Sequence, residues 1–316
     1  MSEISQTVAI IGFGIIGQSW SIAFARAGFR VRVFDTQQET VLPSIGNIQA
    51  ALDDLSRRDL LHQQPPETVL RRISVAASIS EAVSGTVHVQ ENTPENAEVK
   101  SRIFAELDAL APPMAVLASS TSALLPSQFC KGLSGAERCL VAHPLNPPHL
   151  IPAVELVPNS RTTAAVVEQT YDLMCKIGQA PIVARREIPG FIMNRLQGAI
   201  LDEAFALVDE GLCSVEDVDR AVRDGLSRRW GFMGPFETID LNAPGGVEGF
   251  IDRYREAYEE IGKDRPNRRA WTGALREKVT SALRNKLPVC DLTERQAWRD
   301  RQLARLAAYY QQDRTE

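Results

Sequence analysis

The sequence predicts an α/β protein, in which an N-terminal domain with a doubly wound parallel sheet is followed by an all-helical C-terminal domain. Strand-like apolar runs alternate with helical patterns over residues 7–183, as expected for a parallel sheet with helices on both faces. Beyond Pro189-Gly190 the pattern is helical only. The length of 316 residues also exceeds one ordinary hydrophobic core. We therefore expect two domains, residues 1–188 and 189–316.

Composition and charge restrict the classes of function. Hydrophobic residues make up 44% of the chain and charged residues 24%, which is typical of a soluble globular protein. A net charge of −5 argues against a nucleic-acid partner. No apolar run approaches the roughly 20 residues of a membrane-spanning helix, so we expect no membrane partner. The five cysteines are scattered without C-x-x-C spacing, which favours free thiols in a cytoplasmic protein.

The first β-α-β unit covers residues 7–35. Its first strand runs into Gly12-Phe13-Gly14-Ile15-Ile16-Gly17, which has G-x-G-x-x-G spacing. A helical pattern closed by Gly28 follows, and a second apolar strand ends on Asp35. Strand, glycine turn, helix, strand and acid in this order form the fingerprint of a Rossmann-type dinucleotide-binding domain.

Each part of the fingerprint has a physical role. Gly12 allows the sharp turn, Gly14 lets a pyrophosphate approach the backbone, and Gly17 allows close packing of helix against sheet. Asp35 can accept hydrogen bonds from both ribose hydroxyls, and its charge would repel a 2′-phosphate. Thr36-Gln37-Gln38 offers no cation for such a phosphate. The predicted cofactor is therefore NAD rather than NADP.

The later elements follow in order along the chain. A long helical pattern and a break at Pro65-Pro66 predict a helical hairpin inserted at about residues 38–72. In the first domain we expect further strands at residues 73–75, 86–90, 115–118, 140–142, 151–157 and 180–183, and helices at 98–110 and 163–177. In the second domain we expect a long helix at 191–211, breaks at Gly225, Pro235, Pro244-Gly245-Gly246 and Pro266, and a final helix at 294–311. We expect that final helix to pack on the helical domain or on a partner subunit.

Polar side chains at the strand ends are the candidates for chemistry, because ligands of open α/β sheets bind there. NAD-dependent oxidation of a secondary alcohol needs a base that titrates near neutrality, and His143 ends a strand. The base needs an orienting carboxylate, such as Glu155 on the following strand. The alkoxide needs donors, and Ser122 and Asn194 qualify. Taken singly, Ser122 could instead cap the next turn and Asn194 could be an ordinary helix residue. No cluster has metal-ligand spacing, so we predict no metal site.

These motifs resemble the 3-hydroxyacyl-CoA dehydrogenase superfamily, most closely its lambda-crystallin/L-gulonate 3-dehydrogenase branch. The resemblance covers essentially the whole chain. It runs through residues 12–17, 90–96, 119–122, 141–148, 154–158, 190–197, 234–238 and 295–300. The last two segments fit the lambda-crystallin branch better than the acyl-CoA enzymes.

The resemblance implies a role for several residues. It implies that His143 and Glu155 are the catalytic pair, with Ser122 and Asn194 as donors that position the substrate. It also implies NAD contacts at Ile15, Ile16, Asp35, Glu95 and Lys100. A homodimer formed through the helical domain is implied as well.

The substrate class depends on two departures from the acyl-CoA enzymes, which usually carry a basic hairpin and a glycine-rich tail. Here the hairpin arginines, Arg57, Arg58, Arg71 and Arg72, are interspersed with Asp53, Asp54, Asp59 and Glu67. The glycine-rich tail is absent. Both departures favour a small free L-3-hydroxy acid, similar to L-gulonate, which would be oxidised to the 3-keto acid.

Alternative functions remain open at this point. A free acid has a carboxylate that needs a cation, and Arg229 is the candidate, although Arg228 and Arg229 could equally be surface charges. The same chemistry could act on 3-hydroxyacyl-CoA, such as 3-hydroxybutyryl-CoA, or on carnitine. A non-catalytic, crystallin-like NAD-binding protein is a further alternative.

Overall fold

The computed structural model of the chain describes residues 6–244, 246–264, 274, 277, 278, 281, 284, 285 and 288–313. The chain divides into two compact units. The first contains Met1–Asn194 together with Glu294–Glu316, and the second contains Arg195–Thr293. The breaks expected at Gly245 and Pro266 lie outside the described residues.

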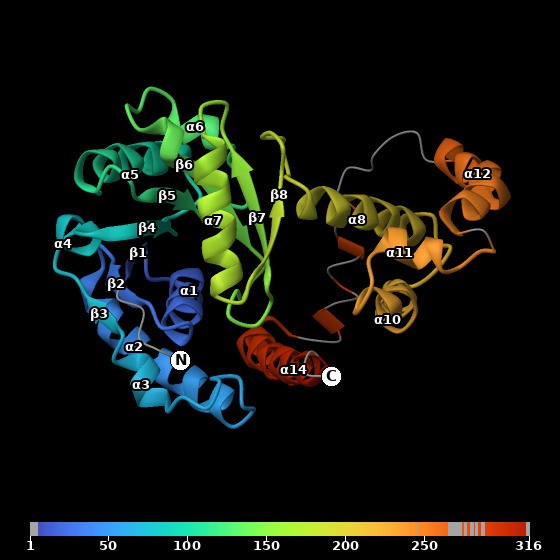
Figure 1. Cartoon of the computed structure of the whole chain (residues 1–316). Helices are drawn as coiled ribbons and strands as arrows, with labels where there is room; N and C mark the ends of the chain where they lie inside the picture. Colours follow the sequence, from blue (N-terminus) through green and yellow to red (C-terminus); the bar gives the residue numbers. More distant parts are fainter. Residues whose placement is uncertain are drawn as a thin grey trace. The chain divides into compact units, whose positions relative to one another are not determined.

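The first unit is built on one eight-stranded sheet in the order β3-β2-β1-β4-β5-β6-β7-β8 (Figure 1). Its strands are β1 (Thr7–Ile11), β2 (Arg30–Phe34), β3 (Ile73–Val75), β4 (Thr86–Glu91), β5 (Val116–Ser119), β6 (Cys139–Pro144), β7 (Ala153–Pro158) and β8 (Ala180–Val183). Its helices are α1 (Ile15–Arg26), α2 (Gln38–Ser56), α3 (Pro66–Leu70), α4 (Ile79–Val83), α5 (Ala97–Leu110), α6 (Pro126–Cys130), η1 (Ala136–Arg138), α7 (Ala164–Lys176) and α14 (Leu292–Asp313).

The strands from β3 to β6 pair in parallel, which confirms the predicted doubly wound sheet. β6 and β7 pair antiparallel, because no helix between them carries the chain back across the sheet. β8 then runs parallel to β7 after the crossover through α7. In the β6–β7 register His143 stands directly opposite Glu155.

Helices cover both faces of the sheet, and each face has its own hydrophobic cluster. On one face, side chains of α1, α2 and α7 pack on alternate residues of the strands, such as Val8 and Ile10 of β1. On the other, α4, α5 and α6 pack on the intervening residues, such as Ala9 and Ile11. Because successive strand residues point to opposite faces, the continuous apolar run of β1 is buried on both sides.

Local capping residues fix where several helices begin. The Asn96 side chain accepts hydrogen bonds from the backbone N–H groups of Glu98 and Val99 at the start of α5. The Ser78 hydroxyl does the same for the N–H of Glu81 in α4. Such side chains satisfy N–H groups that have no partner within the helix.

The second unit is helical. Its elements are most of α8 (Met193–Asp209), α9 (Val215–Arg220), η2 (Ala221–Leu226), α10 (Ser227–Trp230), α11 (Pro235–Asp240), α12 (Gly246–Asp264) and η3 (Val289–Asp291). The expected break at Gly225 is wrong, since η2 is a π-helical turn that continues α9 into α10. A widened turn lets the helix pass through a glycine without ending.

The final helix corrects a second expectation. α14 belongs to the first unit rather than packing on the helical unit. Ala304 of α14 is buried in the same cluster as Trp20 and Phe24 of α1. A small residue at this position allows the two elements to pack closely.

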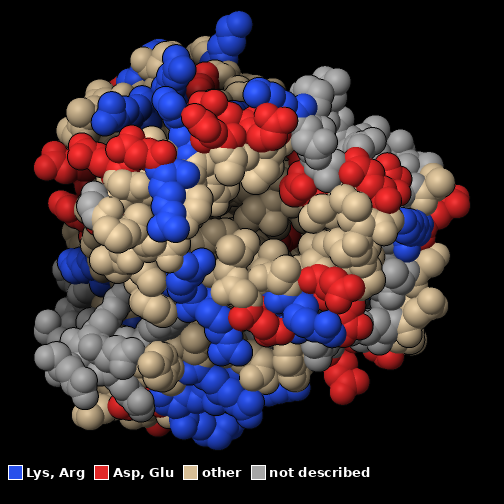
Figure 2. All heavy atoms as spheres, turned by 90° about the vertical axis from the view of Figure 1, so that its right-hand side faces the viewer, with Lys and Arg blue, Asp and Glu red and all other residues tan. Residues whose placement is uncertain are grey.

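In the described part of the chain, no helix is long and apolar enough to cross a bilayer. On the face drawn in Figure 2, basic and acidic side chains both appear, in several places next to one another.

A buried histidine makes the stability of this fold sensitive to acid. His88 of β4 is fully buried, with Nε2 2.9 Å from Oε1 of Gln90 and with Nδ1 lacking a partner. Burial lowers the pKa of His88 from 6.5 to about 4. Between these values the unfolded chain binds the proton and the folded chain does not.

We predict that His88→Gln reduces the loss of stability on acidification. The stabilisation from neutral His88 is complete above about pH 6.5 and is lost as the pH falls toward 4, a loss of about 2–3 kcal/mol by pH 4.5. Urea unfolding at pH 7 and pH 4.5 measures this difference for parent and variant. Equal acid dependence in the two proteins would contradict the assignment to His88.

Candidate active site

The glycine turn after β1 is shaped by close contacts. Gly12 has a φ of 88°, and a Cβ placed there would lie 2.7 Å from the backbone carbonyl of Asn92. A Cβ on Gly17 would lie 2.1 Å from the Gly12 oxygen. A Cβ on Gly14 would meet no atom within 4 Å. Glycine is therefore required for packing at Gly12 and Gly17, whereas the space beside Gly14 is open to a ligand.

The start of α1 suits an anion. Gly14 precedes the helix without a side-chain cap, and the first turn contains no acidic residue. The free N–H groups and the helix dipole therefore favour a phosphate. Ile15 is 68% exposed at this end, while Ile16 packs against the core cluster beneath α1.

Asp35 lies beside this turn and is held there by backbone donors. Its Oδ2 accepts from the N–H of Phe13 at 2.7 Å, and its Oδ1 accepts from the N–H of Gln37 at 2.9 Å. The side chain remains partly exposed, so its oxygens have lone pairs left for ribose hydroxyls. Glycine turn, helix start and carboxylate together fit the two ends of an adenosine diphosphate group.

Glu95 and Lys100 have separate environments. The exposed Glu95 accepts from the hydroxyl of Thr121 and, at 3.0 Å, from the N–H of Ala123, so it lies next to Ser122. Lys100 is 1% exposed, and its Nζ donates to both oxygens of Glu91, at 2.9 and 3.0 Å, and to the Thr93 carbonyl. All three ammonium protons thus have partners. The buried Glu91 carboxylate is thus the ion-pair partner of Lys100, and a direct NAD contact for Lys100 stays a prediction.

Glu91 is a residue that the sequence interpretation missed. It is fully buried and also accepts from the N–H of Thr93 at 2.6 Å and the hydroxyl of Ser119 at 2.5 Å. These bonds join the carboxyl ends of β4 and β5, whose loops carry Glu95 and Ser122. The available signal was an acid at the end of an apolar strand, which needs a buried partner.

The structure pairs His143 with Glu155 across β6 and β7. Nδ1 of His143 lies 2.8 Å from Oε2 of Glu155. The other oxygen, Oε1, accepts from the N–H groups of Ile192 and Met193, at 2.6 and 2.8 Å. Glu155 is fully buried and His143 is 5% exposed. The carboxylate therefore holds the proton on Nδ1 and leaves the lone pair of the imidazole on Nε2.

Ser122 and Asn194 are also brought together. Nδ2 of Asn194 donates to the backbone oxygen of Ser122 at 2.7 Å, which links the loop after β5 to the start of α8. Arg229 lies on α10 of the second unit and is exposed, so its contact with a substrate carboxylate stays a prediction. His149 is a poor base, because burial lowers its pKa to about 3.

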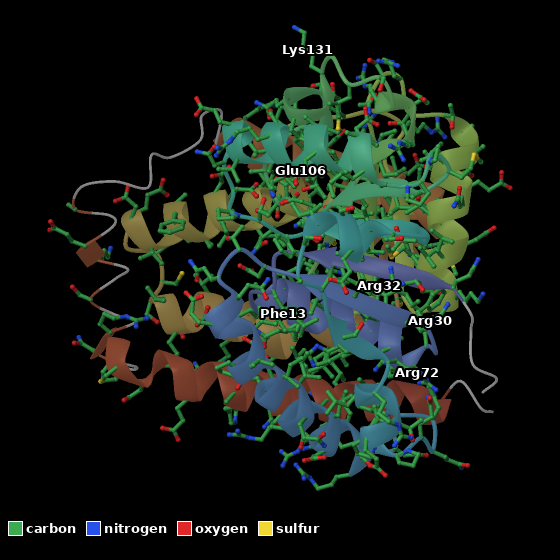
Figure 3. The ribbon with its side chains drawn as sticks, turned by 90° about the vertical axis from the view of Figure 1, so that its left-hand side faces the viewer. Phe13, Arg30, Arg32, Arg72, Glu106 and Lys131 are labelled. Atoms are coloured by element: carbon green, nitrogen blue, oxygen red, sulfur yellow. The ribbon has the colours of Figure 1, made fainter. Side chains whose placement is uncertain are left out.

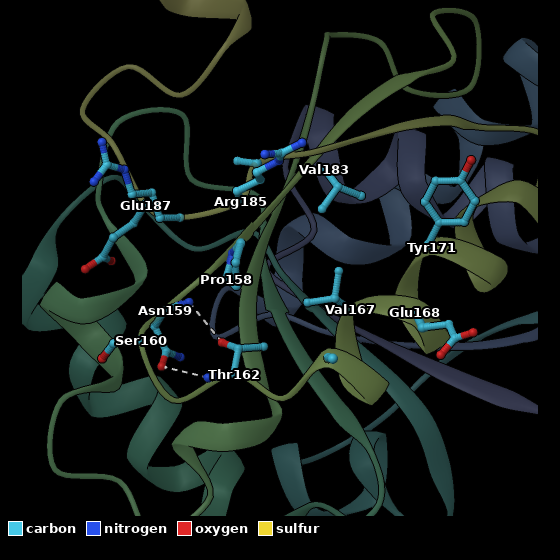
Figure 4. A pocket seen from close by; sticks show the side chains of 13 residues that line it. Pro158, Asn159, Ser160, Thr162, Val167, Glu168, Tyr171, Val183, Arg185 and Glu187 are labelled. Carbon is cyan, nitrogen blue, oxygen red and sulfur yellow. Dashed lines mark hydrogen bonds between the residues drawn. The ribbon is translucent and has the colours of Figure 1, made fainter.

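One further cavity lies away from these residues. A cavity of about 590 Å³ lies beside β8 and α7, lined by residues that include Tyr171, Val183 and Arg185 (Figure 4). None of the predicted site residues lines it. Among the described residues, no group of three His, Cys, Asp or Glu side chains could hold a metal ion.

Comparison with known proteins identifies both parts of the chain. Residues 7–188 match the NAD-binding domain of 3-hydroxyacyl-CoA dehydrogenase, and residues 190–279 match its C-terminal domain. Lambda-crystallin of Oryctolagus cuniculus is 43% identical over 303 residues, covering 95% of each chain. L-carnitine dehydrogenase of Pseudomonas putida is 34% identical over 256 residues, covering 80% of this chain and 78% of that protein.

A solved structure shares the whole architecture. FHMPC 5-dehydrogenase, an NAD+ dependent dismutase, superposes with a TM-score of 0.82 at 26% identity, covering 97% of this chain and 98% of the other. These findings confirm the expected NAD cofactor and the expected class of enzyme. The chain belongs to the 3-hydroxyacyl-CoA dehydrogenase family, on the branch of the lambda-crystallins, and is an NAD-dependent dehydrogenase that acts on a CH–OH group.

Proposed function

We propose that this enzyme oxidises the 3-hydroxyl of a small L-3-hydroxy acid, similar to L-gulonate, to the 3-keto acid. The 2.8 Å contact between His143 and Glu155 is the observation that carries the proposal. It supports a general base whose tautomer is set by a buried carboxylate. In this proposal, NAD held at the glycine turn would supply the hydride acceptor.

Residues of the first unit accept the proton, stabilise the charge that forms and position the substrate oxygen. Nε2 of His143 takes the hydroxyl proton as the carbon loses its hydride. The Glu155 carboxylate stabilises the resulting imidazolium, and the N–H groups of Ile192 and Met193 keep that carboxylate in place. The Ser122 hydroxyl and the remaining amide N–H of Asn194 donate to the substrate oxygen.

The same geometry supports the proposed cofactor contacts. The glycine turn from Gly12 to Gly17 would hold the pyrophosphate at the start of α1, with open space beside Gly14 and with Ile15 and Ile16 alongside. Asp35 would accept from the adenosine ribose. The exposed Glu95 lies beside the Ser122 loop, on the side where the nicotinamide ribose would lie.

The acids among the hairpin arginines support a free acid over a CoA ester. Arg57 and Arg58 both pair with Asp54, at 3.2 Å, so one of their two charges is compensated. The lambda-crystallin relative spans 95% of the chain and supports the same branch. The L-carnitine dehydrogenase relative keeps carnitine as the alternative substrate.

We predict that His143→Ala lowers kcat/KM for alcohol oxidation by about 10²–10⁴. In the parent, kcat/KM should rise with pH as the base loses its proton, and the variant should lose that rise. Steady-state kinetics from pH 5 to 9 measure both effects. His62→Asn, which replaces an exposed histidine in the hairpin, is the control. If the kcat/KM of His143→Ala stayed within a few-fold of the parent value, the mechanism would be refuted.

A substrate panel tests the proposed class. The panel compares kcat/KM with NAD for L-gulonate, 3-hydroxybutyrate, L-carnitine and 3-hydroxybutyryl-CoA. We expect the free hydroxy acids to have the highest kcat/KM. Arg229→Gln should raise KM for a free acid by about tenfold, the value of one charge-assisted pair, while Arg228→Gln should not. Turnover of the CoA ester alone would exclude the free-acid proposal.

We also propose that the enzyme is a homodimer formed through its helical unit and that it works in the cytoplasm. Phe232, Phe236 and Leu241 are 73%, 80% and 71% exposed in that unit. Large apolar side chains gathered on one segment support a protein interface. The free cysteines described above support a reducing compartment.

Light scattering at micromolar concentration should give twice the chain mass for the parent. Removing apolar area from the interface weakens association, so the double variant Phe232→Ser/Phe236→Ser should shift toward one chain mass. Leu42→Ser is the control, because it removes an apolar side chain of the first unit that is 73% exposed. This variant should keep the mass of the dimer. A monomeric parent would overturn the proposal.

A further inference from the structure

A second cavity lies at the opposite end of the sheet from the glycine turn. Its volume is about 410 Å³, and it is lined by Thr7, Thr68, Ser74 and four arginines, Arg30, Arg32, Arg71 and Arg72. The arginines come from β2 and from the turn between α3 and β3, which are neighbours in the sheet. Figure 3 labels Arg30, Arg32 and Arg72 at this end of the first unit.

The positive charge of this cavity is not neutralised by its own lining, which includes no acidic residue. Nη1 of Arg32 donates to the backbone oxygens of Glu81 and Ser84, at 3.1 and 2.6 Å. Nη1 of Arg72 donates to the Ala25 oxygen and to Oε1 of Gln64, at 2.9 and 2.7 Å. Arg71 contacts the hydroxyl of Thr68 at 3.1 Å. Neutral acceptors thus orient these three side chains, and in the described structure none of the three has a carboxylate partner.

We propose that this cavity binds a small phosphate-bearing anion. The guanidinium groups of Arg32, Arg71 and Arg72 keep further N–H donors beyond these neutral contacts, and their planar fork matches two oxygens of a phosphate. The hydroxyls of Thr68 and Ser74 add donors at the same rim. A cavity this small and this polar suits a compact, multiply charged ligand rather than an apolar one.

The site is distinct from that of the cofactor. Thr7 and Arg30 begin β1 and β2, whereas Gly12 and Asp35 follow the carboxyl ends of the same strands. Each strand has five residues, so about 13 Å of strand separates the two ends. Binding in the cavity is therefore independent of NAD and of the proposed reaction.

Inorganic pyrophosphate is the probe. It is titrated by calorimetry, at constant ionic strength, into full-length protein already saturated with NAD. Bound NAD occupies the glycine turn, so pyrophosphate cannot bind there. We expect saturable binding of one pyrophosphate per chain. Arg71→Gln and, separately, Arg32→Gln should each weaken this binding by about tenfold, the value of one charge-assisted contact. Their NAD affinity should not change.

Arg57→Gln is the matched control, because it removes the same charge from an exposed arginine outside the cavity. The pyrophosphate affinity of this variant should stay within about twofold of the parent value. Citrate, added in place of pyrophosphate, should bind at least tenfold more weakly if the site selects phosphate oxygens. Absence of saturable binding, equal losses in Arg57→Gln and Arg71→Gln, or equal affinity for citrate would overturn the proposal.

Discussion

The burial of one carboxylate organises the candidate active site. Glu155 has no contact with solvent, and an ionised group in that position is stable only with close partners. One oxygen faces His143 of β6, and the other accepts two N–H groups just before and at the start of α8. A single side chain on β7 therefore ties together a neighbouring strand and the segment that leaves the sheet.

Glu91 presents the same physical problem with a different solution. Its partners are Lys100, Thr93 and Ser119, so the carboxylate joins the ends of β4 and β5. The imidazole of His143 keeps its second nitrogen for a ligand, whereas all three ammonium protons of Lys100 already have partners. The His143–Glu155 pair is therefore suited to proton transfer, and the Lys100–Glu91 pair is suited to holding two strand ends together. Both lie at the carboxyl edge of the sheet, where a ligand is expected.

The arginines of the hairpin region show how three-dimensional placement changes the meaning of a charge pattern. In the sequence, Arg57, Arg58, Arg71 and Arg72 form one mixed group with nearby acids. In the structure, Arg57 and Arg58 pair with Asp54, whereas Arg71 and Arg72 join Arg30 and Arg32 around a cavity. Arg57, Arg58 and Asp54 together keep one net positive charge, whereas Arg71 and Arg72 donate to neutral groups.

The sequence by itself determined the features that depend on local rules. Gly12, Gly14 and Gly17 between two apolar runs predicted the nucleotide-binding turn, because backbone freedom and close packing at those positions require glycine. The strand and helix pattern predicted the doubly wound sheet and its helical partner, and the strand-end rule selected His143. The sequence also suggested that His143 pairs with Glu155. The β6–β7 register places these two residues directly opposite each other.

Only the tertiary structure decided features that depend on competition for partners. Lys100 matched a cofactor contact in sequence, and the structure pairs it with the buried Glu91 carboxylate, a partner that its spacing did not reveal. α14 lies at the end of a helical region, yet Ala304 packs with the core beneath α1. Spacing along the chain cannot rank such alternatives, because burial and distance set the energy of each contact and both come from the folded arrangement.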